Sequence, residues 1–399
     1  MDRREFTRFL ATLAAGPLLT GRQQSAPAGG ASIKPPSDAA LAHIRRLMEI
    51  GGVPGVAAGI VTPAGLSWHC LEGVVDVSTR QPVDMRTMFP AASLGKPVFA
   101  HLVLRLADEE RIDLDKPLKS YLADHTPADP RGDKITARHV LAHSTGLRNW
   151  RNSPEQPLVP EFDPGSRFQY SGEGFYYLQR VVETVASNGI EQVVQDRLFA
   201  PLGMRSSTYV WRDDTRARLW TGHSRGNPQR DPSRDFADRL LEYARTKGKP
   251  LATFTHSEIV TAMTEIKPAP RALPITMIPN VAGSLLTTLE DYATYLKNHL
   301  QPVSGPTELK PATRQAMTSP QTRINSALSW GLGWGLEAEA GREYLWQWGD
   351  NGTFRNFVLA HLPTRSAIVV FTNGSSGLRI AEHLIASATG HQHLAFDWL

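Results

Sequence analysis

A serine and a lysine lie three residues apart at the start of an apolar stretch with helical character. Residues 89–104 read FPAASLGKPVFAHLVL, which places the serine at 93 and the lysine at 96. Because positions i and i+3 share a helix face, Ser93 and Lys96 can bring a hydroxyl beside an amine. Burial disfavours a charged lysine, so Lys96 could be neutral and accept the serine proton. Taken alone, a helix start with a solvated lysine is the competing interpretation.

Two later segments add groups that could act with this pair. Tyr170 follows a Pro-Gly turn in PGSRFQYSGEGFYYL and precedes another helical pattern. Near a lysine cation, its phenol pKa could be lowered enough for it to relay a proton. The segment LWQWGDNGTFRNFVLAHLP predicts a strand, in which Gly349 permits close approach of a substrate. The backbone N–H of Asp350 could then complete an oxyanion hole.

At these three places the sequence resembles the serine hydrolases grouped with class C β-lactamases, D-Ala-D-Ala carboxypeptidases and family VIII-type carboxylesterases. That superfamily carries S-x-x-K, then Y-x-N, then K-T-G or H-x-G, and residues 93–96, 170–172 and 347–349 follow the same order. The resemblance continues through ERIDLDKPLKSYL, ITARHVLAHSTGL, FAPLGM, AGSLLTTLEDYATYL and WGLGWGL. It therefore covers nearly the whole mature chain.

The resemblance implies a role for each motif residue. Ser93 becomes the acylated nucleophile, Lys96 and Tyr170 handle protons, and the N–H groups of Ser93 and Asp350 form the oxyanion hole. No metal and no cofactor is expected. The positions expected to contact substrate are Ser171, Gly172, Gln347, Trp348 and Gly349.

Two motif positions depart from the superfamily pattern. Gly172 stands where an asparagine usually holds a substrate amide, and Gln347 replaces a cationic or imidazole residue. A lost cation weakens recognition of a substrate carboxylate by about 1.5–3 kcal/mol, the contribution of a charged hydrogen bond. Trp348 would narrow the cleft and offer an apolar wall. Arg355 is either a replacement cation facing the cleft or a solvated strand arginine.

The pattern of elements predicts an α/β (α+β) fold of the β-lactamase/transpeptidase type. Strand-like hairpins near both chain ends indicate one antiparallel sheet flanked by helices, and the helical patterns between them indicate an inserted domain. We expect a sheet domain from residues 37–105 with 282–399, and a mainly helical domain from 106–281. Within the latter, residues 211–279 are expected to form a long rim around one helical island.

The N-terminus indicates export. MDRREFTRFLATLAAGPLLTG resembles a twin-arginine leader, with a cleavage site at residues 26–28 and a spacer at 29–36. We therefore expect a periplasmic or secreted protein without a transmembrane segment in the mature chain. Removal of residues 1–28 lowers the net charge from +4 to +2. So small a positive charge does not indicate a nucleic-acid-binding protein. The expected partner is a small-molecule or peptide substrate, and the oligomeric state stays open.

Other patterns suggest chemistry less strongly. Ser224 lies in GHSRG, a G-x-S-x-G match, but the polar, proline-containing stretch after it does not suit the helix that a nucleophile elbow requires. His139 and His143 have the spacing of paired zinc ligands, yet they lack the accompanying glutamate, so packing or capping is favoured. His391 and His393 are interpreted as surface residues. Cys70, the single cysteine, is expected in a strand and not as a nucleophile.

The sequence thus predicts an exported serine hydrolase that works through an acyl-enzyme on Ser93. Its substrate class is a carboxyl ester, a β-lactam or a D-amino-acid peptide, and the departures at Gly172 and Gln347 favour substrates without a strict carboxylate requirement. Whether Lys96 or Tyr170 is the resting base stays open, because coupled groups titrate as a unit. The alternative is a penicillin-binding or scaffold protein that keeps the fold but turns over poorly.

Overall fold

One antiparallel sheet, built from both ends of the chain, forms the centre of the protein. The computed structural model describes residues 32–122, 127–152, 156–268, 278–301, 304–339 and 341–399. The predicted leader at 1–28 and the first residues of the spacer lie outside this described part. In spatial order the strands are β2 (Gly65–Gly73), β1 (Gly55–Thr62), β12 (Ser366–Thr372), β11 (Arg355–His361), β10 (Arg342–Asp350), β9 (Gly335–Glu339), β8 (Leu328–Trp330) and β7 (Thr322–Arg323).

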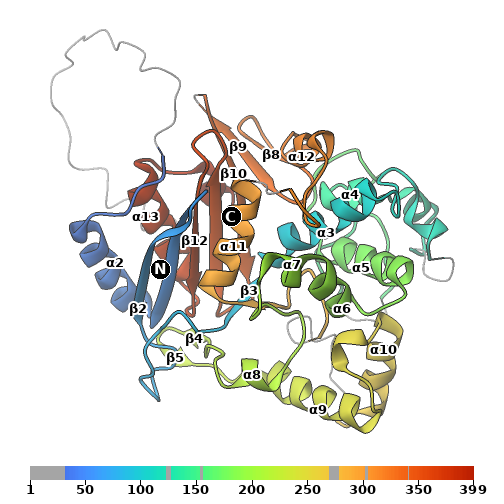
Figure 1. The fold of residues 1–399 in the computed structure, drawn as a ribbon, viewed down its shortest axis with the longest axis horizontal. Coiled ribbons are helices and arrows are strands. Elements are labelled where there is room, and N and C mark those ends of the chain that lie inside the picture. Colours follow the sequence, from blue (N-terminus) through green and yellow to red (C-terminus); the bar gives the residue numbers. More distant parts are fainter. Residues whose placement is uncertain (1–31, 123–126, 153–155, 269–277, 302–303, 340) are drawn as a thin grey trace.

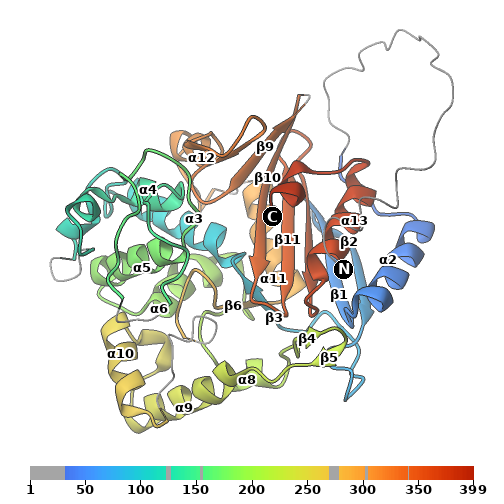
Figure 2. The ribbon, with the colours of Figure 1, turned by 180° about the vertical axis from the view of Figure 1, so that it is seen from behind.

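Alternating apolar residues bury both faces of this sheet. On one face, Val56, Ala58 and Ile60 of β1 pack with helices α2 (Asp38–Gly51) and α13 (Gly377–Thr389). On the other, Ala57 and Val61 pack with α11 (Leu289–Leu300). Figures 1 and 2 show these helices on opposite sides of the strands. The predicted α/β architecture, with a sheet assembled from the two termini, is confirmed.

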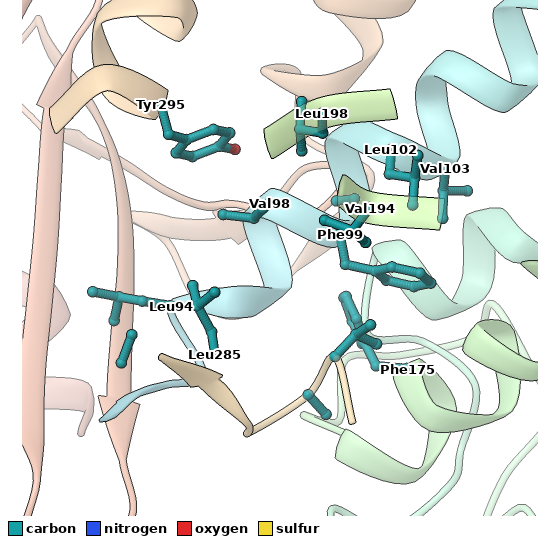
Figure 3. Packing of buried hydrophobic residues seen from close by; sticks show 14 of the residues in the cluster. Leu94, Val98, Phe99, Leu102, Val103, Phe175, Val194, Leu198, Leu285 and Tyr295 are labelled. Carbon is teal, nitrogen blue, oxygen red and sulfur yellow. The ribbon is translucent and has the colours of Figure 1, made fainter. Parts of the chain in front are cut away.

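Helix α3 (Gly95–Asp108) is buried along nearly its whole length between the sheet and the helical region. Figure 3 shows Val98 and Phe99 of α3 among Phe175 of α5 (Gly172–Ala186) and Tyr295 of α11. One continuous apolar cluster therefore joins the sheet to the inserted helices. A buried helix of this kind holds its N-terminus, where Ser93 and Lys96 lie, in a fixed place.

The remaining elements connect or cover this framework. The small strands are β3 (Phe89–Ala92) with β6 (Leu285–Thr287), and β4 (His223–Ser224) with β5 (Asn227–Pro228). The other helices are η1 (Leu118–Ser120), η2 (Pro130–Lys134), α4 (Ala137–Leu141), α6 (Ile190–Val194), η3 (Gln195–Phe199), α7 (Ala200–Leu202), α8 (Asp213–Arg216), α9 (Pro232–Thr246), η4 (Leu251–Thr253), α10 (His256–Glu265), α12 (Pro311–Met317) and α14 (Leu394–Trp398).

The expected rim at 211–279 contains more helix than the sequence suggested. Both α9 and α10 form in it, where one helical island was expected. Helix α10 begins with a capping box between Thr255 and Glu258, and its Ile259 and Ala262 pack against α9 in a small separate core. Figures 1 and 2 show these helices along the lower edge of the molecule, away from the sheet.

Three minor expectations resolve in this framework. Ser224 lies in the two-stranded β4–β5 hairpin, which is not the strand-to-helix turn of a nucleophile elbow. The polar stretch after it nevertheless does open a helix, because Pro232 occupies the first turn of α9 and Asp231 caps it. Cys70 is a buried strand residue, and burial raises its thiol pKa to about 11.

Candidate active site

The nucleophile candidate lies on a strained turn between β3 and α3. Ala92 adopts a φ of 53°, which is uncommon for a residue with a side chain. Ser93 follows it and precedes Leu94, the N-cap of α3, which makes no side-chain capping bond. The Ser93 hydroxyl is therefore not used for capping. Its Oγ lies 2.9 Å from the Nζ of Lys96 and 3.3 Å from the carbonyl oxygen of Ala282.

Lys96 is held in an uncharged environment. Its side chain is 1% exposed, and its Nζ donates to the carbonyl oxygen of Ala282 at 2.7 Å. Burial holds the pKa of Lys96 well below its usual value of 10.5. A neutral amine keeps a lone pair, so Lys96 can accept the proton of Ser93 Oγ while it still donates to Ala282.

Tyr170 reaches the same place from the segment that leads into α5. The Lys96 Nζ lies 4.9 Å from the centre of the Tyr170 ring, and the hydroxyl is hydrogen-bonded to Ser93. The Nε2 of Gln347 donates to the Tyr170 hydroxyl at 3.0 Å. The structure thus brings together Ser93, Lys96 and Tyr170, which lie 77 or fewer positions apart in the sequence.

The expected direction of the Tyr170 pKa shift is wrong. The sequence suggested that a lysine cation would lower it, but burial raises the pKa of Tyr170 above its ordinary value of 10.0. Hydrogen bonds from Ser93 and Gln347 oppose this only in part. The physical reason is that Lys96 is buried too, so the cation that should stabilise a phenolate is itself disfavoured. Tyr170 rests as a neutral phenol.

Strand β10 brings the oxyanion candidate beside the nucleophile. A Cβ atom added to Gly349 would lie 2.4 Å from the carbonyl oxygen of Ala91, so only glycine lets β10 approach β3 this closely. Asp350 follows at the end of the strand. Its carboxylate pairs with Arg355 at 2.7 Å and accepts the N–H of Gly352 at 2.7 Å. The role of the Asp350 N–H in an oxyanion hole stays a prediction.

Arg355 was left open as a replacement cation, and its guanidinium is engaged elsewhere. Besides the ion pair with Asp350, it donates to the carbonyl oxygen of Gly352 at 3.0 Å. These contacts tie the arginine to the turn after β10.

Gln347 and Trp348 point their side chains to different partners. Gln347 is fully buried, and its Nε2 donates to the Tyr170 hydroxyl and, at 2.8 Å, to the carbonyl oxygen of Trp348. A glutamine expected to contact substrate therefore contacts the proton-handling tyrosine. The Trp348 ring is partly exposed and lies 4.3 Å from the Tyr170 ring, centre to centre.

Ser171 and Gly172 form the N-terminus of α5. The Ser171 hydroxyl accepts the N–H of Gly174 at 2.9 Å and donates to the carbonyl oxygen of Arg148 at 2.9 Å, so it caps the helix. A Cβ atom on Gly172 would lie 2.3 Å from the ring of Trp150. Trp150 thus occupies the space into which an asparagine side chain at position 172 would extend.

His143 is a site neighbour whose importance the sequence did not show. Its ring lies tilted against that of Tyr170, with the ring centres 4.1 Å apart. Its Nδ1 accepts the N–H of Ser171 at 3.0 Å, and its carbonyl oxygen accepts the N–H of Gln169 at 2.7 Å. His143 therefore fixes the backbone on both sides of Tyr170. The sequence favoured a packing or capping role for His143 over metal binding, and the ring does pack. Nothing in the sequence indicated that Tyr170 was its packing partner.

The other histidine expectations also resolve. His139 caps α4, where its Nδ1 accepts the N–H of Thr136 at 3.3 Å. The surface interpretation of His393 is wrong, because its side chain is buried against Glu337 at 3.1 Å.

Within the described ranges, no three histidine, cysteine or acidic side chains are grouped to hold a metal ion. In the same ranges no helix is long and apolar enough to cross a membrane.

Comparison with known proteins agrees with this geometry. The family model described as Beta-lactamase matches residues 41–389, and the chain belongs to that family. Esterase EstB of Burkholderia gladioli is 27% identical over 187 residues, which cover 39% of this chain and 47% of EstB. The matched part thus spans about half the length of that curated relative.

Solved structures share the fold. The octameric penicillin-binding protein homologue from Pyrococcus abyssi superposes with a TM-score of 0.67 at 19% identity, over 89% of this chain and 78% of that one. EstCE1, a hydrolase with promiscuous acyltransferase activity, gives a TM-score of 0.67 at 19% identity, over 88% of this chain and 99% of its own. The predicted membership of the serine β-lactamase-like superfamily is confirmed.

Proposed function

We propose that this protein is a serine hydrolase that cleaves carboxyl esters through an acyl-enzyme on Ser93. The observation that carries the proposal is the contact between Ser93 Oγ and the buried Lys96 Nζ at 2.9 Å, with Tyr170 hydrogen-bonded to the same hydroxyl. A hydroxyl, a neutral amine and a neutral phenol in contact can activate a nucleophile and return its proton.

We propose Lys96 as the resting base, supported by its burial, its lowered pKa and its contact with Ser93 Oγ. Neutral Lys96 accepts the proton as Ser93 Oγ bonds to the carbonyl carbon, and the oxyanion forms beside the N–H groups of Ser93 and Asp350. As the bond to the leaving oxygen breaks, the lysine proton passes through Tyr170 to that oxygen. A water molecule then attacks the acyl group, gives its proton to Lys96 by the same route, and the carboxylic acid leaves as Ser93 recovers its proton.

The proposed substrate preference is supported by the residue types at the site end of β10, residues 347–350, which include no cation. Gln347 is neutral and bonded to Tyr170, and Arg355 is paired with Asp350. Penicillins, cephalosporins and D-Ala peptides carry a carboxylate that such a strand would leave unpaired, which disfavours them. A neutral ester has no such requirement. We also propose that the chain belongs to the class C-like branch of the family, and the support is the order of its three motifs.

We also propose that the protein is exported to the periplasm or secreted. The support is the twin-arginine-like leader at residues 1–28 and the small residues at 26–28. An exported enzyme would then encounter its substrate, a small molecule or a peptide, outside the cytoplasm.

Replacing Ser93 tests the proposed activity. We expect Ser93→Ala to lower hydrolysis of p-nitrophenyl butyrate by about 10³-fold or more, because it removes the attacking oxygen. Ser224→Ala is the control, because Ser224 of β4 lies in the G-x-S-x-G match that does not form a nucleophile elbow. It should retain wild-type rates. Unchanged turnover in Ser93→Ala would contradict the proposal.

Mass spectrometry distinguishes the alternative function. A penicilloyl adduct that persists on Ser93, together with negligible ester turnover, would favour a penicillin-binding protein. Rapid turnover of the ester without a lasting penicilloyl adduct supports the esterase.

A further inference from the structure

Beside the proton-handling tyrosine lies a corner made of two tryptophans that come from distant parts of the chain. Trp348 of β10 and Trp398 of α14 have ring centres 5.4 Å apart and planes at 79°. Both side chains are partly exposed. Trp348 also lies 4.3 Å from Tyr170, so the corner continues directly from the site.

The C-terminal helix is anchored firmly enough to hold Trp398 in this position. The N–H of Ala395 and the ring of His393 both bond to the buried carboxylate of Glu337, at 3.0 and 3.1 Å. Phe396 stacks on Phe357 of β11 with ring centres 4.1 Å apart. Figure 2 shows the C-terminus lying over the strands that carry Trp348 and Phe357. The first residues of this short helix and the residue before it are thus fixed to the sheet, and Trp398 follows them directly.

The position relative to Tyr170 indicates which half of an ester meets this corner. The leaving oxygen must lie next to Tyr170, because the proton that it receives comes through that hydroxyl. The group attached to the leaving oxygen therefore lies against the surface that continues from Tyr170, which is formed by Trp348 and Trp398. The acyl group, by contrast, is attached to Ser93 beside the N–H of Asp350.

The chemistry of the corner selects an uncharged, flat group. Phe168 closes the inner side, with its ring centre 5.7 Å from that of Trp398. Two indoles at nearly a right angle can stack on one face of an aromatic ring and meet its edge. Two cations of the site do not offer a free charge to this corner, since Lys96 is buried against Ser93 and Arg355 is paired with Asp350.

We propose that Trp398 and Trp348 form a subsite for an aromatic alcohol portion of the ester substrate, and that Trp398 determines this specificity. The proposal rests on the proposed esterase activity. Trp398 is a substrate-contacting residue of the leaving-group side and takes no part in proton transfer.

The test compares esters that differ only in the half of the molecule that carries the aromatic ring. Benzyl butyrate and methyl butyrate have alcohols of similar basicity, so their ratio of kcat/KM reports recognition of the alcohol group. Methyl phenylacetate carries the ring on the acyl side. We expect Trp398→Ala to lower the benzyl-to-methyl ratio about 3- to 10-fold, mainly through KM, while Trp398→Phe keeps most of it.

Trp68→Ala is the matched control, because Trp68 is another partly buried tryptophan that packs on the same apolar cluster from β2. Its ratio should equal that of the wild type. An unchanged ratio in Trp398→Ala would overturn the subsite, and a selective loss on methyl phenylacetate would overturn its assignment to the alcohol side. Wild-type protein that hydrolyses none of the three esters would instead refute the proposed function, and the subsite with it.

Discussion

Burial shifts the pKa values of Lys96 and Tyr170 in opposite directions, and both shifts favour the uncharged group. It lowers the pKa of the lysine and raises that of the tyrosine, so burial favours the uncharged form of both groups. A neutral amine is a base strong enough to take the Ser93 proton, whereas the oxygen of a neutral phenol is a far weaker base. This difference supports the proposed division of roles, with Lys96 as the base and Tyr170 as the relay to the leaving group.

This division predicts the pH dependence of the reaction. At low pH Lys96 is protonated and inactive as a base, so kcat/KM should rise with pH and level off well below 10.5. Because the pKa of Tyr170 is raised, ionisation of the phenol should not end the plateau in the neutral range. The measurement is a pH profile of ester hydrolysis from pH 4 to pH 10.

The matched variant is Lys96→Arg, which keeps a positive charge at all pH values and should lose about 10²- to 10⁴-fold in rate throughout. A wild-type profile in which kcat/KM is still rising about tenfold per pH unit up to pH 10 would contradict the proposed neutral lysine.

Two elements explain why the second motif departs from the superfamily pattern. The loop before α5 presents Trp150 against Gly172, and the Oδ1 of Asn149 accepts the Gly172 N–H at 2.8 Å. The indole of Trp150 thus leaves room only for a glycine at position 172, so packing excludes the asparagine of the superfamily motif. The sequence alone showed the missing asparagine but not the reason, because Trp150 and Gly172 are joined only through the fold.

Restoring the asparagine should therefore destabilise the protein. We expect Gly172→Asn to lower the free energy of unfolding by about 1–3 kcal/mol, the usual cost of overpacking. In a Trp150→Ala background the same substitution should cost clearly less, because the indole no longer fills the space. Urea unfolding of the four proteins in this cycle measures the coupling. Equal costs in both backgrounds would show that Trp150 does not set the residue at 172.

Across the whole molecule, the sequence predicted the parts that depend on local pattern. The hairpin β1–β2, the strands β10 to β12 and the helix α13 follow from alternation, turn residues and helical spacing, and the sheet joins both chain ends as expected. Ser93, Lys96 and Tyr170 were found because their residue types and order are distinctive. The fold then places them together.

Contacts between distant segments were not predictable in the same way. The Ala282 carbonyl that binds Lys96 is a backbone group, so no side chain marks it. The ring contacts of His143 with Tyr170 and of Trp398 with Trp348 join residues that are 27 and 50 positions apart. Only one of the helices α9 and α10 was expected, because the apolar residues that they bury belong to a small core of their own, shared with neighbouring loop residues. Each of these features depends on tertiary packing and not on a local pattern.

Labelling with a fluorophosphonate, followed by peptide mapping, tests most directly whether these segments form one reactive centre. The probe reacts with a serine only where a base and an oxyanion site meet it. We expect a single adduct on Ser93, absent from Ser93→Ala and strongly slowed in Lys96→Arg. An adduct on Ser224, or no labelling of folded wild-type protein, would contradict the account.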